Sequence, residues 1–143
     1  MGLLSLATFF PLLGMFIILF IPKKNLLAIK IVAAVVTFIP LVITSYLWMH
    51  YDYAMAGINL KDQYQFVEQY AWIPAYNIEF FIGVDGLSFP MLWLTTLLNF
   101  LAIFASWNIA RAQKGYFALF LLLATSMMGV FVSLDFFLFY VFW

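Results

Sequence analysis

The chain has 143 residues, of which 68% are hydrophobic and only 8% are charged, and its formal net charge at pH 7 is zero. About a quarter of the residues in an ordinary soluble domain are charged, so this composition excludes that class and indicates an integral membrane protein. We therefore expect the lipid bilayer as its surroundings and no nucleic acid among its partners.

The first two predicted membrane spans cover residues 3–21 and 31–49, which contain no charged side chain. Runs of about 19 residues rise roughly 28 Å as helix, which is enough for the hydrocarbon core of a bilayer. The first run has no basic residue before it and ends in Pro22-Lys23-Lys24 rather than in a small-residue cleavage site. We therefore interpret it as a transmembrane helix and not as a signal peptide.

A proline lies inside each of these two spans and is expected to bend it. Pro11 and Pro40 each remove one backbone hydrogen bond. In a bilayer the freed carbonyl groups must find other donors, and the nearby hydroxyls of Thr8, Thr37 and Thr44 are candidates. We interpret the bends as fixed features of packing rather than as hinges.

A single histidine, His50, follows the second span, and the chain contains no cysteine. Iron–sulfur clusters need several thiolates and a bis-histidine haem needs two imidazoles, so we expect this chain alone to bind no redox centre. Structural zinc is not expected either. His50 stands beside Tyr51 and Tyr53, and we interpret it as an interfacial residue in an aromatic belt.

The long connection of residues 50–86 is too aromatic for a disordered linker. Apolar and polar residues alternate in part of it, and residues 65–72 and 77–83 flank the turn sequence Pro74-Ala75-Tyr76. This pattern predicts a short hairpin on the outer surface of the membrane. An amphipathic surface helix is the alternative, which Pro74 disfavours.

Two further spans are predicted at residues 87–107 and 116–134. Asp85 and Asp135 stand before helical segments, where a carboxylate can cap the first backbone amides, and we expect both to be helix caps. The apolar residues 136–143 would reach only about 12 Å as helix. We predict an all-α bundle of four complete transmembrane helices plus the start of a fifth, in an amino-terminal fragment of a longer protein or a truncated product.

The charges between the spans are sorted by sign. The connection of residues 50–86 carries five acidic residues and one lysine, whereas the two short connections carry only basic residues. The positive-inside rule places these basic connections on the cytoplasmic side, or on the equivalent matrix or stromal side, and the amino terminus outside. The basic residues are Lys23, Lys24, Lys30, Arg111 and Lys114.

Polar side chains are few within the predicted spans, and no carboxylate, lysine or histidine is among them. A proton-carrying bundle usually contains an ionisable residue, so on its own residues the chain is a poor pump. Asn99 is the most costly of the polar groups to leave unpaired in lipid. It either joins two helices through a hydrogen bond or lines a hydrated path. Our proton-path candidates are Thr95, Asn99, Thr125 and Ser126.

Several stretches resemble one family, that of chain M of NADH-quinone oxidoreductase (respiratory complex I), whose mitochondrial equivalent is NADH dehydrogenase subunit 4. The resemblance is strong from about residue 66 to the end, and the tract at residues 83–88 is fairly specific. The matching tracts are Trp72-Ile73-Pro74, Gly83-Val84-Asp85-Gly86-Leu87-Ser88, Leu94-Thr95-Thr96-Leu97-Leu98, Ala105-Ser106-Trp107, Gly129-Val130-Phe131, Leu134-Asp135 and Leu138-Phe139-Tyr140-Val141-Phe142-Trp143.

The resemblance implies a proton-translocating subunit in the membrane arm of complex I, an enzyme that couples electron transfer from NADH to quinone with proton pumping. It implies that the other membrane-arm subunits are partners, and that other subunits use NAD, FMN, iron–sulfur clusters and quinone. The expected location is the bacterial plasma membrane, or alternatively the mitochondrial inner or the thylakoid membrane. The functional glutamate and lysine of the family would lie beyond residue 143, so the resemblance assigns no catalytic residue here.

Two alternatives stay open. A subunit of a multisubunit Na⁺/H⁺ antiporter or of a membrane-bound hydrogenase would share the helical pattern and would exchange ions without NADH. A structural membrane subunit without transport would use Asn99 and the uncharged helices for packing only.

Overall fold

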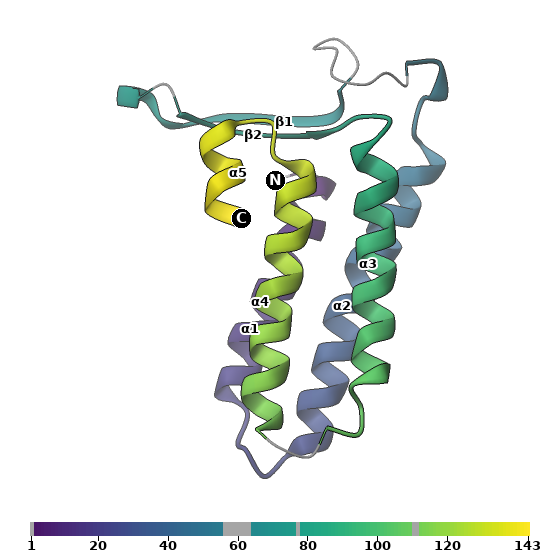
Figure 1. Cartoon of the computed structure of the whole chain (residues 1–143), viewed down its shortest axis with the longest axis vertical. Helices are drawn as coiled ribbons and strands as arrows, with labels where there is room; N and C mark the ends of the chain where they lie inside the picture. Colours follow the sequence, from purple (N-terminus) through teal and green to yellow (C-terminus); the bar gives the residue numbers. More distant parts are fainter. Residues whose placement is uncertain (1, 56–63, 77, 110–111) are drawn as a thin grey trace.

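The computed structural model describes residues 2–55, 64–76, 78–109 and 112–143. Four long helices lie side by side and alternate in direction (Figure 1), and each is long and apolar enough to cross a membrane. They are α1 (Leu3–Phe20), α2 (Leu26–Met49), α3 (Ser88–Ala105) and α4 (Gln113–Val132). The predicted fold of four transmembrane helices is confirmed, and the protein is a multi-pass membrane protein.

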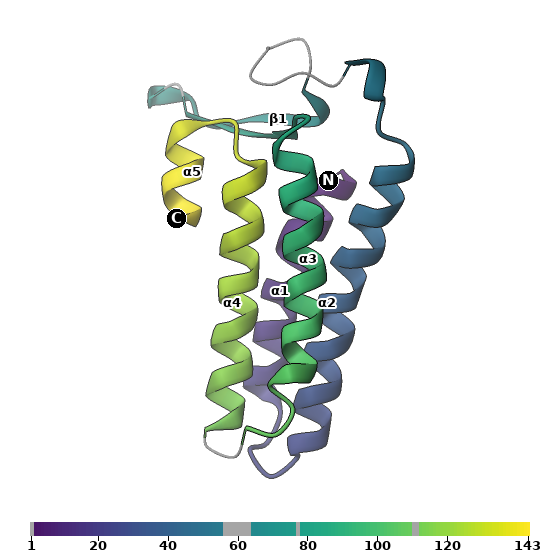
Figure 2. The same cartoon turned by 45° about the vertical axis from the view of Figure 1, so that its right-hand side comes forward.

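The four helices form a bundle in which α1 packs against α2 and α4, while α3 packs against the same two helices from the other side (Figure 2). Large apolar side chains are buried in two clusters, one toward each end of the bundle. The first cluster, at the end that carries the amino terminus, includes Leu4, Leu47, Phe89 and Val132. The second, at the opposite end, includes Ile18, Ile29, Ile103 and Phe117.

Two of the helices, α2 and α4, begin before the charge-free runs from which they were predicted. Helix α2 begins at Leu26 and so includes Lys30, and α4 begins at Gln113 and includes Lys114. The expectation of lysine-free spans therefore holds for the apolar runs but not for these helices. A lysine near a helix end can keep its charge at the membrane surface because its stem is long and flexible. The Lys30 Nζ lies 5.6 Å from the centre of the Trp107 ring.

A β-hairpin crosses one end of the bundle (Figure 1). Its antiparallel strands are β1 (Gln65–Ile73) and β2 (Ile78–Val84), with Tyr70 opposite Phe80 in the register. The 3-10 turn η3 (Pro74–Tyr76) follows β1, and another, η1 (Tyr53–Met55), follows α2. The predicted hairpin is confirmed over the alternative surface helix, and the fold is therefore not purely helical.

The connection between α4 and the short helix α5 (Phe136–Phe142) ties the bundle to this hairpin. The Leu134 amide donates to the Phe81 carbonyl at 2.9 Å, and Ser133 forms an isolated antiparallel bridge with Ile82. Helix α5 then turns back alongside α4 (Figure 1). The hairpin thus contacts both the bundle and α5.

Candidate functional site

A polar layer lies halfway along the bundle, between its two apolar clusters. Thr37, Thr96 and Asn99 come from α2 and α3, and they line a narrow cavity that is too small to hold a water molecule. The two helix prolines, Pro11 and Pro40, line it as well, and α4 closes it with Ala124 and Met128. Polar side chains of the bundle therefore gather at the level where Pro11 and Pro40 each remove a backbone hydrogen bond from α1 and α2.

Hydrogen bonds across this region join α2 to α3. The hydroxyl oxygens of Thr44 and Thr96 lie 3.0 Å apart, and the Trp93 indole donates to the Ser45 hydroxyl at 2.9 Å. The Trp93 carbonyl lies 2.7 Å from the Thr96 hydroxyl and is an alternative acceptor for its single proton. Interhelical bonds of this kind contribute about 0.6 kcal/mol each in membrane proteins, so they fix the packing more than they stabilise it.

Asn99 is the most demanding group in the layer. Its side chain is 7% exposed, and its Nδ2 is buried without a hydrogen-bond partner among the residues that the structure describes. An unpaired buried donor costs about 1 to 3 kcal/mol. The arrangement therefore favours another polar group near Asn99, because the cavity beside it has no room for a water molecule.

The other three proton-path candidates lie elsewhere. The Thr95 hydroxyl donates to the Met91 carbonyl at 2.7 Å, and the Thr125 hydroxyl donates to the Leu121 carbonyl at 3.2 Å, each within its own helix. Ser126 is half-buried. None of these three side chains lines the cavity beside Asn99, whereas Thr37 and Thr96, which were not among the predicted proton-path residues, do.

The threonines near the prolines do not replace the lost backbone bonds, and this prediction was wrong. Each hydroxyl donates instead to a carbonyl one turn before its own residue. Thr8 bonds to Leu4, Thr37 to Ala33 and Thr44 to Pro40, all at 2.9 Å. A threonine in a helix reaches the carbonyl four residues back most easily, so local geometry decides the partner.

A buried carboxylate organises the hairpin end of the bundle. Glu68 of β1 is only 9% exposed. Its Oε2 accepts from the Gly2 amide at 2.8 Å and from the Ser5 hydroxyl at 2.7 Å, while its Oε1 accepts from the Ser5 amide at 3.0 Å. A residue distant in sequence thus caps the start of α1, where the helix dipole is positive.

These contacts determine the charge state of Glu68. Burial alone would raise the pKa of its carboxyl group, but hydrogen bonds from the Ser5 side chain and from the Ser5 and Gly2 backbone hold the pKa below its ordinary value. Glu68 is therefore a stable anion at neutral pH. The sequence shows only an acidic residue in a loop, with no local sign of this partner.

The two predicted caps lie at the starts of the helices that follow them. Asp85 accepts at Oδ1 from the Leu87 and Ser88 amides, at 3.1 and 2.6 Å, and the Ser88 hydroxyl accepts from the Asp85 amide at 3.0 Å. Asp135 is the N-cap residue of α5, and its side chain accepts from the Leu138 amide at 2.9 Å. Both carboxylates stabilise local backbone.

Aromatic side chains surround the end of α2. His50 follows the helix, and its ring centre lies 4.3 Å from that of Tyr46. Tyr51 packs between Tyr53 and Phe89, with ring centres 5.5 and 5.0 Å away. Burial and the nearby Asp85 carboxylate raise the pKa of the Tyr51 hydroxyl. The environment of His50 is thus an aromatic one, and within the described ranges no group of histidine and acidic residues is arranged to hold a metal ion.

A lysine caps the opposite end of α1. The Lys114 ammonium group donates to the carbonyl oxygens of Leu19 and Ile21, each at 2.8 Å, and so joins the start of α4 to the end of α1. A cation is favourable there because the last carbonyls of a helix carry partial negative charge. Arg111, which was assigned to the same basic connection, lies outside the described residues.

Known proteins match this chain along most of its length. The family described as NADH-ubiquinone oxidoreductase chain 4, amino terminus, matches residues 29–134. A relative from Nostoc sp., NAD(P)H-quinone oxidoreductase chain 4 1, is 41% identical over 67% of this chain and 17% of its own length. NADH-ubiquinone oxidoreductase chain 4 of Arabidopsis thaliana is 36% identical over 92% of this chain and 26% of its own length.

Another relative extends the match to almost the whole chain. NAD(P)H-quinone oxidoreductase chain 4 1 of Picosynechococcus sp. is 34% identical over 98% of this chain and 25% of its own length. The chain thus spans about a quarter, or less, of the length of the curated relatives it matches.

Proposed function

We propose that the parent protein is a proton-translocating subunit in the membrane arm of an NAD(P)H-quinone oxidoreductase, because this chain belongs to the family of NADH-ubiquinone oxidoreductase chain 4. The observation that carries the proposal is the match of that family over residues 29–134, which include all of α3 and α4 and nearly all of α2. In such an enzyme, electron transfer to quinone takes place in other subunits and drives proton movement through the membrane arm.

The composition of this chain suits that division of labour. It supplies a membrane scaffold and a polar layer, while NAD, FMN, iron–sulfur clusters and quinone would be bound by partner subunits. We propose the other membrane-arm subunits as its protein partners and the lipid bilayer as its surroundings. The relatives are all named as quinone oxidoreductase chains, which favours this assignment over the Na⁺/H⁺ antiporter.

Purification from the native membrane in a mild detergent tests the assignment. The parent protein should co-purify with flavin, iron–sulfur clusters and NADH-dependent quinone reduction. Sodium-dependent proton exchange by a preparation that lacks flavin and iron would instead support the antiporter. An assembly with neither activity would support the purely structural role.

We also propose an orientation, with the amino terminus and hairpin outside and the two basic connections inside. The location would be the plasma membrane of a bacterium, with an organelle inner membrane or a thylakoid as the alternative. The sorted charges support this orientation through the positive-inside rule. The α1–α2 and α3–α4 connections lie together at one end of the bundle, opposite the hairpin (Figure 1).

Single cysteines can test this orientation because the chain has none of its own. In intact cells, a membrane-impermeant maleimide should label a Tyr76→Cys variant in the hairpin turn, where the side chain is 79% exposed. An Asn25→Cys variant, between α1 and α2, should react only after the membrane is permeabilised. The reverse pattern of labelling would contradict the proposed orientation.

Asn99 is the residue we propose to contribute to proton movement, by offering a buried amide donor in the polar layer. Losing one hydrogen bond worth about 1.4 kcal/mol would slow a proton step by about tenfold. We therefore expect Asn99→Leu to reduce proton translocation in membrane vesicles by up to about that factor. The amount of assembled complex on native gels should stay unchanged.

A Thr95→Val variant is the matched control for this experiment, since the Thr95 hydroxyl bonds only within its own helix and does not line the cavity. It should translocate protons at nearly the rate of the original protein. Normal translocation in Asn99→Leu together with a weakened assembly would show that Asn99 serves packing alone.

A further inference from the structure

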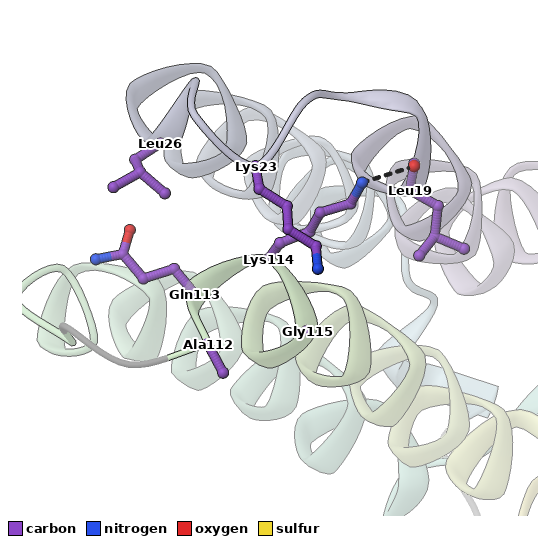
Figure 3. A pocket seen from close by; sticks show the side chains of 7 residues that line it. All are labelled: Leu19, Lys23, Leu26, Ala112, Gln113, Lys114 and Gly115. Atoms are coloured by element: carbon purple, nitrogen blue, oxygen red, sulfur yellow. Dashed lines mark hydrogen bonds between the residues drawn. The ribbon is translucent and has the colours of Figure 1, made fainter.

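An open cavity lies at the basic end of the bundle, where the α1–α2 connection meets the start of α4 (Figure 3). Its volume is about 530 Å³. Lysine side chains, the first turn of α4 and leucine side chains together form its lining. The lining residues are Leu19, Lys23, Leu26, Ala112, Gln113, Lys114 and Gly115.

Two positive charges converge on this cavity. Lys23 extends from the α1–α2 connection toward α4, and Lys114 extends from α4 toward the end of α1 (Figure 3). Among the described residues no carboxylate lines the cavity, and the sequence has no acidic residue before Asp52 or between Asp85 and Asp135. The described residues therefore supply no nearby acidic counter-ion, and the cavity attracts anions.

The first turn of α4 adds hydrogen-bond donors. The first amides of an α-helix have no acceptor within the helix, and they point outward from its positive end. The N-cap residue Ala112 makes no side-chain hydrogen bond to these amides. Gly115 leaves the surface open, because a Cβ atom there would meet nothing within 4 Å. An anion could therefore approach the start of α4 closely.

The apolar part of the lining indicates which anion fits. Leu19 and Leu26 border the cavity and are 50% and 41% exposed, and they lie at the ends of helices long enough to span a membrane. A free inorganic anion gains no binding free energy from contact with these leucines. A phospholipid gains from both parts of the lining, because its phosphate meets the charges while its acyl chain covers the leucines.

We propose that this cavity binds an anionic phospholipid, with the headgroup phosphate at Lys23, Lys114 and the first amides of α4, and an acyl chain along Leu19 and Leu26. Lys23 is the group free to move onto the phosphate. Lys114 also holds the last carbonyls of α1, so a lipid bound here bridges α1 and α4 at the membrane surface. The proposal is independent of proton translocation.

The experiment uses the complete purified complex and a phosphatidylglycerol that carries a photoreactive group near the top of one acyl chain. Crosslinked peptides are mapped by mass spectrometry, so that labelling at residues 19–26 and 112–115 is separated from labelling elsewhere. A basic residue at an anionic surface changes binding by about fivefold. Lys23→Gln should therefore reduce labelling of these segments by about that factor.

Lys24→Gln is the matched control, because Lys24 is exposed in the same connection but does not line the cavity. It should change labelling by less than about twofold, and unlabelled phosphatidylglycerol should compete where phosphatidylcholine does not. An equal loss in both lysine variants, or equal competition by phosphatidylcholine, would overturn the site. If inorganic phosphate displaces the photoreactive lipid at the same concentration as the competing lipid, the cavity binds a free anion and the proposed phospholipid is wrong.

Discussion

Replacing Glu68 with alanine should lower the free energy of unfolding by about 2 to 3 kcal/mol, because a charged acceptor that serves three donors disappears. The Gly2 amide and both the amide and hydroxyl of Ser5 would lose their partner. Ser5 is buried, so water could replace the carboxylate only in part. We expect α1 to lose its connection to the hairpin, measured as a lower midpoint of unfolding in a detergent denaturation series.

Glu79→Ala is the control, because Glu79 lies on the same hairpin and, among the described residues, its side chain accepts a hydrogen bond only from Gln69 in an exposed position. Its effect should stay within about 0.5 kcal/mol. An effect of Glu79→Ala as large as that of Glu68→Ala would show that the hairpin as a whole, and not the cap on α1, accounts for the loss.

The same carboxylate makes stability depend on pH. Since the native pKa of Glu68 lies below its ordinary value, the unfolded chain takes up a proton first as the pH falls. The contribution of Glu68 is therefore complete above the ordinary carboxyl pKa and is lost as the pH falls through the lower native value. Glu68→Gln should remove this part of the acid-induced loss of stability. If stability depends on pH in that variant as in the original protein, Glu68 does not act as a charged cap on α1.

Gly14→Ala is expected to destabilise the bundle by about 1 to 3 kcal/mol, although alanine is the better helix former. A Cβ at Gly14 would lie 2.4 Å from the Val36 Cγ1 and 2.9 Å from its Cβ. The latter atom is fixed to the backbone of α2, so the whole helix must move away. The separation would reach the polar layer, to which α1 and α2 contribute Pro11 and Thr37. The loss of stability should appear in the same denaturation series.

Gly115→Ala makes the same chemical change in α4 where nothing lies within 4 Å of the new Cβ. It should be neutral or slightly stabilising, by up to about 1 kcal/mol, because only helix propensity changes. Combining Gly14→Ala with Val36→Gly should restore part of the lost stability by returning the missing space. If Gly14→Ala and Gly115→Ala change the stability equally, Gly14 is not required for the close packing of α1 on α2.

Hydropathy and local sequence patterns predicted the larger features of this fold. The charge-free runs marked the four helices, because a bilayer excludes charge along about 20 residues. The alternation around Pro74 marked the hairpin, and Asp135 was recognisable as a residue before a helix. Each of these features depends on residues that are close together in the chain.

The contacts between distant elements could not be predicted in this way. Nothing in the local sequence pairs Glu68 with Ser5, or Lys114 with the end of α1, because which helix ends meet is decided by packing. The adjacent residues Thr95 and Thr96 illustrate the same limit. Neighbours on a helix face directions about 100° apart, so the rotation of α3 within the bundle decides that Thr96, and not Thr95, lines the cavity.

The polar layer and the family assignment connect the structure to the proposed function. The layer offers a buried donor, unpaired among the described residues, halfway along the bundle, while Glu68 and Lys114 cap the two ends of α1. Such a scaffold supplies a polar donor but no titratable group inside the apolar runs. The ionisable relay of the proposed pump would then belong to other parts of the parent protein or to its partners.

The most direct measurement is the number of protons translocated for each NADH oxidised, in vesicles that contain the complete enzyme and in vesicles from cells that lack the gene for the parent protein. The account predicts that the ratio falls in any complex still able to transfer electrons to quinone without this subunit. An unchanged ratio in that complex would contradict a role for the subunit in proton translocation.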